Sequence, residues 1–160
     1  MEQGNFNIRV YGLIVHEHKL LLTDEFRLGI CMTKFPGGGL QFGEGPVDCL
    51  KRECLEELNQ EVEILSHYYT TDYFQQSELL PGAWQILNIY YRARLKGEPA
   101  FRTTEKVFDF EHVDGAQTFR WADHETLSSE NMTLPIDRKV VAMILSDPES
   151  LFNGFGSSDN

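Results

Sequence analysis

The sequence is poor in basic residues. Of its 160 residues, 14 are lysine or arginine and 25 are aspartate or glutamate, which gives a net charge of −11. Proteins that bind nucleic acids or anionic membranes non-specifically need a basic surface, so this balance argues against both classes of partner. A phosphorylated small molecule stays compatible with it, because bound divalent cations can reverse the sign of the local field.

Cysteine is also scarce, and long hydrophobic runs are missing. The three cysteines, at positions 31, 49 and 54, have no CxxC spacing. This disfavours a metal or disulfide role and favours free, mostly buried thiols in a reducing compartment. No apolar stretch approaches the roughly 18 residues of a membrane span. The first residues lack the basic start and apolar stretch of a secretory signal. We therefore expect a cytoplasmic protein.

The length and the order of elements predict a single α+β domain over residues 1–160, with a core at about 5–147 and a frayed tail. Hydrophobic residues make up 41% of the chain, as in globular proteins. Apolar patterns predict a hairpin over 7–23, an extended piece at 31–35, later strands at 62–75, 83–95 and 117–122, and helices at 46–58, near 123–127 and at 137–146. This order predicts a mixed β-sheet flanked by helices, an α/β/α sandwich.

The strand predicted over 83–95 offers two faces. One set of side chains alternates and is expected to be buried: Leu87, Ile89, Tyr91, Ala93 and Leu95. Trp84 and Arg92 lie on the other face. Trp84 is a candidate for stacking on a base, with core packing as the alternative. Arg92 is a candidate phosphate contact, with a solvent-facing strand end as the alternative.

Residues 37–60, GGGLQFGEGPVDCLKRECLEELNQ, combine glycines with an acidic helix. Proline is favoured in the first helical turn and asparagine after the last one, so Pro46 and Asn59 predict the boundaries. The apolar stripe of the helix is predicted to be Val47, Leu50, Cys54 and Leu58.

Three acids of this helix form a ridge beside the apolar stripe. Glu53, Glu56 and Glu57 fall within about 100° of one another on a helical wheel. Their repulsion costs roughly 0.2–0.5 kcal/mol per pair. A solvated acidic face is the plainer interpretation, although only Lys51 and Arg52 would compensate it. Carboxylates with a backbone carbonyl make an all-oxygen site that suits Mg²⁺ or Mn²⁺ and metal-assisted attack of water on a phosphoanhydride.

The segment resembles the Nudix box, whose family pattern is G-x5-E-x7-R-E-U-x-E-E-x-G-U, with U a bulky aliphatic residue. Gly38, Glu44, the pair Arg52-Glu53 and the pair Glu56-Glu57 occupy the matching positions. Cys54, Asn59 and Gln60 depart from the pattern. Cysteine and asparagine suit a buried position and a helix end, whereas Gln60 replaces an apolar anchor that Val62 is expected to supply. The resemblance spans roughly residues 5–147.

The resemblance implies roles for these residues. Glu53, Glu56, Glu57 and the Gly38 carbonyl would hold the divalent cations, with Glu57 as the central ligand. Arg52 would orient the carboxylates, and Glu44 would connect the loop to the helix. The general base would be Glu56 or a later acid. Glu98, Glu105, Glu111 and Asp114 are the later candidates, of which Glu111 and Asp114 are favoured; ordinary loop acids are the alternative.

The resemblance also implies an activity. We expect a Mg²⁺- or Mn²⁺-dependent hydrolase that cleaves a diphosphate linkage in a nucleoside diphosphate linked to another moiety. The alternative is a nucleotide-binding sensor on the same fold, without turnover. Lys34, close to the glycines, is a candidate phosphate contact. Family members are often homodimers, and the interface candidates are Tyr68, Tyr69, Tyr73 and Phe74.

Overall fold

The structure is a computed structural model that describes residues 3–152. Contacts divide these residues into two compact units: the first contains 3–13 and 36–101, and the second contains 14–35 and 102–152. Strand β1 (Asn5–His16) contributes residues to both units. Within the described part of the chain, no helix has the length and apolar character needed to cross a membrane.

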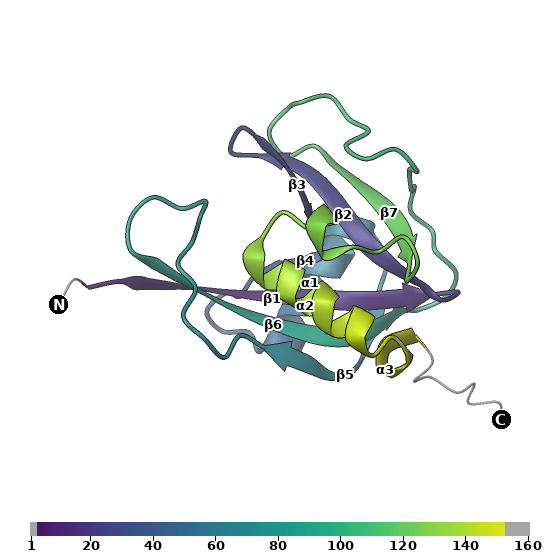
Figure 1. Cartoon of the computed structure of the whole chain (residues 1–160), viewed down its shortest axis with the longest axis horizontal. Coiled ribbons are helices and arrows are strands. Elements are labelled where there is room, and N and C mark those ends of the chain that lie inside the picture. Colours follow the sequence, from purple (N-terminus) through teal and green to yellow (C-terminus); the bar gives the residue numbers. More distant parts are fainter. Residues whose placement is uncertain (1–2, 153–160) are drawn as a thin grey trace. The chain divides into compact units, whose positions relative to one another are not determined.

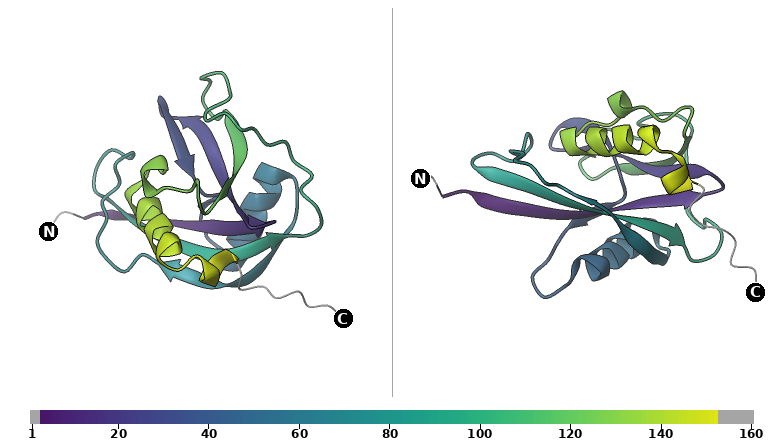
Figure 2. Two further views of the ribbon diagram at one scale, coloured as in Figure 1. Left: turned by 45° about the vertical axis from the view of Figure 1, so that its right-hand side comes forward. Right: turned by 60° about the horizontal axis from the view of Figure 1, so that its bottom comes forward.

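The first unit is a small sheet with one helix. Besides β1 it contains β4 (Gly37–Gly39), α1 (Pro46–Leu58), β5 (Val62–Thr70) and β6 (Trp84–Leu95). Strands β5 and β6 are antiparallel, β6 lies next to β1, and β1 pairs antiparallel with β4 through Arg9↔Gly39 and Tyr11↔Gly37. Helix α1 contacts β4 and β5 and lies along one face of this sheet (Figures 1 and 2).

Helix α1 has the predicted boundaries. Pro46 occupies its first position, and Asn59 ends it in the left-handed conformation (φ 51°), with its N–H donating to the Leu55 carbonyl. The apolar stripe differs at one position, because Cys49 is fully buried whereas Val47 is only half-buried. The Cys49 side chain faces the carbonyl groups of β4, which accounts for its burial.

Strand β6 does not have the single buried face that its alternation predicts. Ala93 and Leu95 are buried as expected, but Leu87, Ile89 and Tyr91 are half-buried. On the opposite face Asn88 and Tyr90 are almost completely buried. A strand that is covered on both faces loses the difference in burial on which an alternation argument depends. The Tyr90 ring packs 5.6 Å from the Tyr11 ring and 6.3 Å from the Tyr69 ring.

The second unit is built around β2 (Lys19–Arg27). This strand pairs antiparallel with β3 (Ile30–Lys34) and with β7 (Gln117–Asp123), and a tight turn joins it to β1. Glu17 and His18 have φ values of 49° and 61° in that turn, as two-residue hairpin loops require. Figure 2 shows β3, β2 and β7 side by side. The remaining elements are η1 (Ser129–Asn131), α2 (Pro135–Ser146) and α3 (Glu149–Phe152).

The prediction of a helix near 123–127 is wrong. The chain forms a single turn there, in which the Asp123 carboxylate accepts hydrogen bonds from the N–H groups of Glu125 and Thr126, at 3.1 and 2.8 Å, and the Leu127 N–H donates to the Asp123 carbonyl. These bonds hold the pKa of Asp123 below its usual range. Short helices follow instead at η1 and, unpredicted, at α3. The tail predicted to be frayed, 153–160, lies outside the described residues.

Buried charges lie inside the second unit. Asp24 on β2 is completely buried, and its carboxylate accepts hydrogen bonds from the Thr33 hydroxyl (2.7 Å), the Phe108 N–H (3.2 Å) and the Arg120 guanidinium. Glu25, the next residue, forms an ion pair with Lys34. Several donors around one carboxylate offset the cost of removing its charge from water.

Candidate functional site

Strand β4 and helix α1 meet at the acidic ridge, which consists of Glu53, Glu56 and Glu57. The Gly37 N–H donates to Oε2 of Glu57 at 3.4 Å. A Cβ atom on Gly38 would lie 2.4 Å from Cδ of Glu53, closer than atoms can approach. The glycine therefore leaves the space that the Glu53 carboxylate occupies.

Arg52 connects the acids of this region. Its guanidinium donates to both carboxylate oxygens of Glu44 (2.8 and 2.9 Å), to Glu53 (3.0 Å) and to Glu56 (3.3 Å). It also donates to the Gly39 carbonyl at 3.2 Å. A planar group with five donors can satisfy several acceptors at once, as Arg52 does here.

Glu44 joins the glycine-rich loop to the helix. Its carboxylate accepts the Gln41 N–H at 2.9 Å as well as the two bonds from Arg52. The Arg52 hydrogen bonds are the main reason why the pKa of Glu44 falls from 4.5 to about 2. Glu44 thus contacts both the loop, at Gln41, and the helix, at Arg52.

Cys49 and Cys54 are free thiols buried beside these acids. The Cys49 sulfur lies 3.5 Å from the Gly39 carbonyl oxygen. Burial raises the pKa of Cys49 to about 12 and raises that of Cys54 as well. Both residues therefore remain protonated at neutral pH.

The donor set fits a hard divalent cation. Three carboxylates and the Gly38 carbonyl provide only oxygen ligands on adjoining elements. As described, however, α1 has no three acids whose oxygens all lie within 4.8 Å of one another. Glu53 and Glu56 point to Arg52 instead, and Glu57 lies near the Gly37 N–H. Direct binding of one cation by all three carboxylates would therefore need their side chains to rotate.

Trp84 and Arg92 also belong to the first unit. Trp84 begins β6, and its backbone pairs with Ser77. The Arg92 guanidinium lies 5.3 Å above the Tyr68 ring, a cation–π contact. Both side chains are half-buried.

Lys34, Glu111 and Asp114 belong to the second unit. Lys34 is only 3% exposed, and its ammonium lies 3.3 Å from Glu25. Asp114 accepts the N–H of Leu28 at 3.1 Å, in the turn between β2 and β3. Glu111 is exposed. Asp114 thus has a structural contact that its position in the sequence did not indicate.

Gln60 explains the departure from the family pattern just after α1. Its amide donates to the carbonyls of Lys96 and Glu98 at 3.1 and 2.9 Å and accepts the Ala100 N–H at 2.9 Å. A polar anchor has therefore replaced the apolar one. Val62 is buried as expected. Only the unusual residue type at position 60 could have signalled this role.

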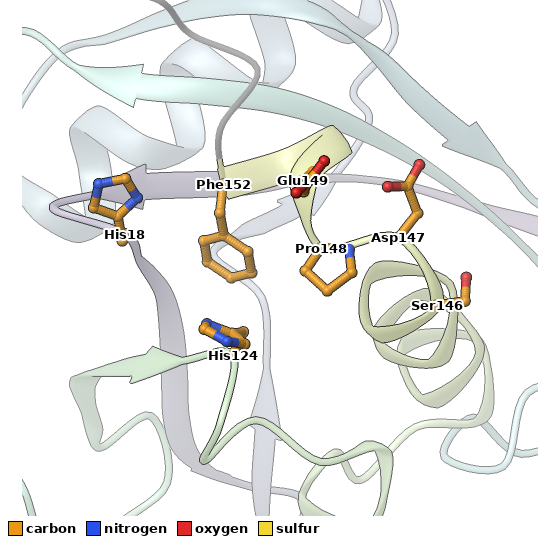
Figure 3. Close-up of a pocket in the computed structure, with 7 residues that line it drawn as sticks. All are labelled: His18, His124, Ser146, Asp147, Pro148, Glu149 and Phe152. Atoms are coloured by element: carbon orange, nitrogen blue, oxygen red, sulfur yellow. The ribbon is translucent and has the colours of Figure 1, made fainter.

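The second unit also contains a cavity of about 510 Å³ beside the junction of α2 and α3 (Figure 3). In Figure 3 the Phe152 ring points toward His124, while the carboxylates of Asp147 and Glu149 point away from it. The cavity contains none of the residues that the sequence predicted for the site. Its lining residues are His18, His124, Ser146, Asp147, Pro148, Glu149 and Phe152.

Known proteins share the family and the fold of this chain. The family model described as NUDIX domain matches residues 6–144. A NUDIX hydrolase from Nitrosomonas europaea is 19% identical, with a TM-score of 0.67 over 93% of this chain and 75% of that one. The Escherichia coli ORF135 protein is 16% identical, with a TM-score of 0.64 over 98% and 96% of the two chains. A MutT NUDIX hydrolase from Burkholderia pseudomallei is 18% identical, with a TM-score of 0.63 over 89% and 98%.

A search of curated proteins gave no match to this sequence. The family model confirms the resemblance seen in the box, and the solved structures confirm the α+β fold, a mixed sheet with a few helices in a sandwich.

Proposed function

Because the chain belongs to the Nudix family and is a Nudix-type pyrophosphohydrolase, we propose that it uses Mg²⁺ or Mn²⁺ to cleave a nucleoside diphosphate linked to another moiety. The family is generally metal-dependent and acts on small nucleoside diphosphate derivatives. The observation that supports this proposal best is the cluster around Arg52, where one guanidinium contacts three glutamates and the Gly39 carbonyl.

In this proposal, Glu53, Glu56, Glu57 and the Gly38 carbonyl hold the cation. When bound, the cation neutralises phosphate charge and acidifies water. Arg52 fixes the orientation of Glu53 before the substrate arrives. Its bonds to Glu44 keep the glycine loop next to the helix.

The general base is proposed among three acids. Glu56 is the most exposed acid in the Arg52 cluster, which leaves one side of its carboxylate open to water. Between the two later candidates we favour Glu111, because Asp114 already accepts a hydrogen bond from Leu28. A base must be within hydrogen-bond reach of the proton that it removes.

Three further residues are proposed to contact the substrate. Trp84 and Arg92 suit a base and a phosphate, respectively, and both are half-buried. Lys34 is the weakest of the three, since contact with a phosphate would require its buried ion pair with Glu25 to open.

The proposal is tested by measuring hydrolysis of a panel of nucleotide sugars, dinucleotides, nucleoside triphosphates and diphosphoinositol compounds with Mg²⁺.

The variant Glu57→Gln should lower turnover by a factor on the order of 10² to 10⁴, as for loss of a positioned catalytic group. Glu61→Gln is the matched control, because Glu61 is an exposed acid just past the helix. Equal small effects of the two substitutions would reject the metal role of Glu57.

The panel also separates turnover from sensing. Binding of nucleotides without hydrolysis of any of them would favour a sensor on the same fold.

A cytoplasmic location and a homodimer remain predictions. Of the aromatics suggested for a dimer interface, Tyr73 and Phe74 are 37% and 69% exposed, whereas Tyr69 packs against Tyr90.

A further inference from the structure

A thiol–imidazole pair lies in the second unit, outside the acidic ridge. Sγ of Cys31 on strand β3 is 3.6 Å from Nε2 of His112, a hydrogen-bonding distance for sulfur. Cys31 is half-buried and His112 is exposed, so both groups are open to small molecules. A nucleophile within reach of a base is the arrangement that activates thiols for attack.

The imidazole has a fixed position over the sulfur. Phe26 is the direct partner of Cys31 across β2 and β3, and its ring stacks on the His112 ring with centroids 5.0 Å apart and planes 10° apart. The segment that carries His112 is fastened to Phe26 by two backbone hydrogen bonds of 2.9 Å, one from Gly115 and one to Ala116. Packing and backbone bonds thus orient the base, as a third group does in catalytic triads.

The other two cysteines provide a contrast inside the same chain. Cys49 and Cys54 are completely buried. A thiol reacts as its thiolate and only where a reagent can reach it. Reaction at Cys49 or Cys54 should therefore be slow in the folded protein.

We propose that the Cys31–His112 pair is a site of covalent modification by low-molecular-weight disulfides. His112 Nε2 takes the proton of the Cys31 thiol, and the thiolate attacks one sulfur of the disulfide. The new bond joins Cys31 to that sulfur, the original S–S bond breaks, and the departing thiolate takes the proton from His112. Cys31 is oxidised, the reagent is reduced, and one thiol is released.

The test uses the full-length protein and 2-hydroxyethyl disulfide, an uncharged reagent. Modification is followed by mass spectrometry with peptide mapping between pH 6 and 8. Wild-type protein is expected to gain one adduct, at Cys31, before Cys49 or Cys54 reacts. His112→Gln should slow this reaction about tenfold at pH 7 and make its rate rise more steeply with pH. His112→Phe keeps a ring over Phe26 but has no base, and should be equally slow.

The control is His124→Gln, which removes an exposed histidine elsewhere in the second unit and should react like wild type. Melting curves verify that each variant is folded. Equal rates at Cys31 in wild type and both His112 variants would mean that exposure alone governs reaction, and would overturn the proposal. Earlier reaction at Cys49 or Cys54, or no reaction at Cys31, would also overturn it. The readout involves no hydrolysis, so its outcome is independent of the proposed function.

Discussion

Gly38 has no side chain, and the Glu53 carboxylate occupies the space where a Cβ atom would lie. Gly38→Ala places a methyl group there and should displace Glu53 from Arg52. We expect weaker Mg²⁺ binding and a loss of about 1–3 kcal/mol in the free energy of unfolding, a typical cost of overpacking. Calorimetric metal titration and urea unfolding measure the two effects.

The matched control is Gly39→Ala, where the nearest atom outside the adjacent residues, Nη1 of Arg9, would be 3.7 Å from the added Cβ, an ordinary contact distance. Similar metal binding in the two variants would show that crowding at Gly38 does not affect the acidic ridge.

The free energy of unfolding should depend on pH through Glu44. Its pKa is about 2 in the folded protein against an ordinary value of 4.5, mainly because of Arg52. A lowered pKa means that the charged form favours the folded state, so its contribution is complete above about 4.5 and is lost as the pH falls toward about 2. Between pH 5 and 2, Glu44→Gln should therefore lose less unfolding free energy than wild type. Parallel curves of unfolding free energy against pH for the two proteins would contradict this expectation. The control variant, Glu61→Gln, should behave like wild type.

The residues of the acidic ridge were predictable because a helix converts spacing into a common face. Arg52 donates hydrogen bonds to Glu44 and Glu53, while the functional roles that the resemblance implied for them stay predictions. The contact between Asp114 and Leu28 was not predictable, since it joins residues 86 positions apart. The burial of Lys34 beside Glu25 likewise depends on strand register, which the sequence pattern left open.

At the scale of elements, Gln60 fixes the exit from α1. Gln60→Leu keeps roughly the size of the side chain. It removes the three hydrogen bonds to the backbone of Lys96, Glu98 and Ala100. We expect a loss of about 1–3 kcal/mol in unfolding free energy, the usual cost of leaving polar partners unsatisfied. Urea unfolding measures it. Gln76→Leu, at an exposed position, should change it by less than about 0.5 kcal/mol. Equal losses would contradict the anchoring role.

Element boundaries with a local cause were predicted well. The turn before β2 and both ends of α1 depend on a few adjacent residues, including Pro46 and Asn59. The burial pattern of β6 was not predicted, because that strand is covered on both faces. At 123–127 the chain forms one hydrogen-bonded turn that does not continue as a helix.

For the whole molecule, the acidic ridge predicts stabilisation by metal. A cation that binds only the folded state at 100 times its Kd adds about 2.7 kcal/mol. Melting in Mg²⁺ should therefore occur at a higher temperature than in EDTA, by about 5–11 °C. The increase should shrink in Glu57→Gln, which removes one ligand charge. Identical midpoints with and without Mg²⁺ would reject the site as we describe it.

The buried carboxylate of Asp24 has a consequence for synthesis on the ribosome. Its partner Arg120 follows 96 residues later, so β2 leaves the ribosome long before β7 can pair with it. During that interval the strand presents unpaired backbone groups, which is where nascent chains aggregate. Asp24 and Glu25 are then charged and hydrated, and charges within a strand oppose pairing with other chains. Lys34 follows closely on the next strand and can pair with Glu25 early, whereas the charge of Asp24 is expected to oppose pairing of β2 with other chains until β7 has been made.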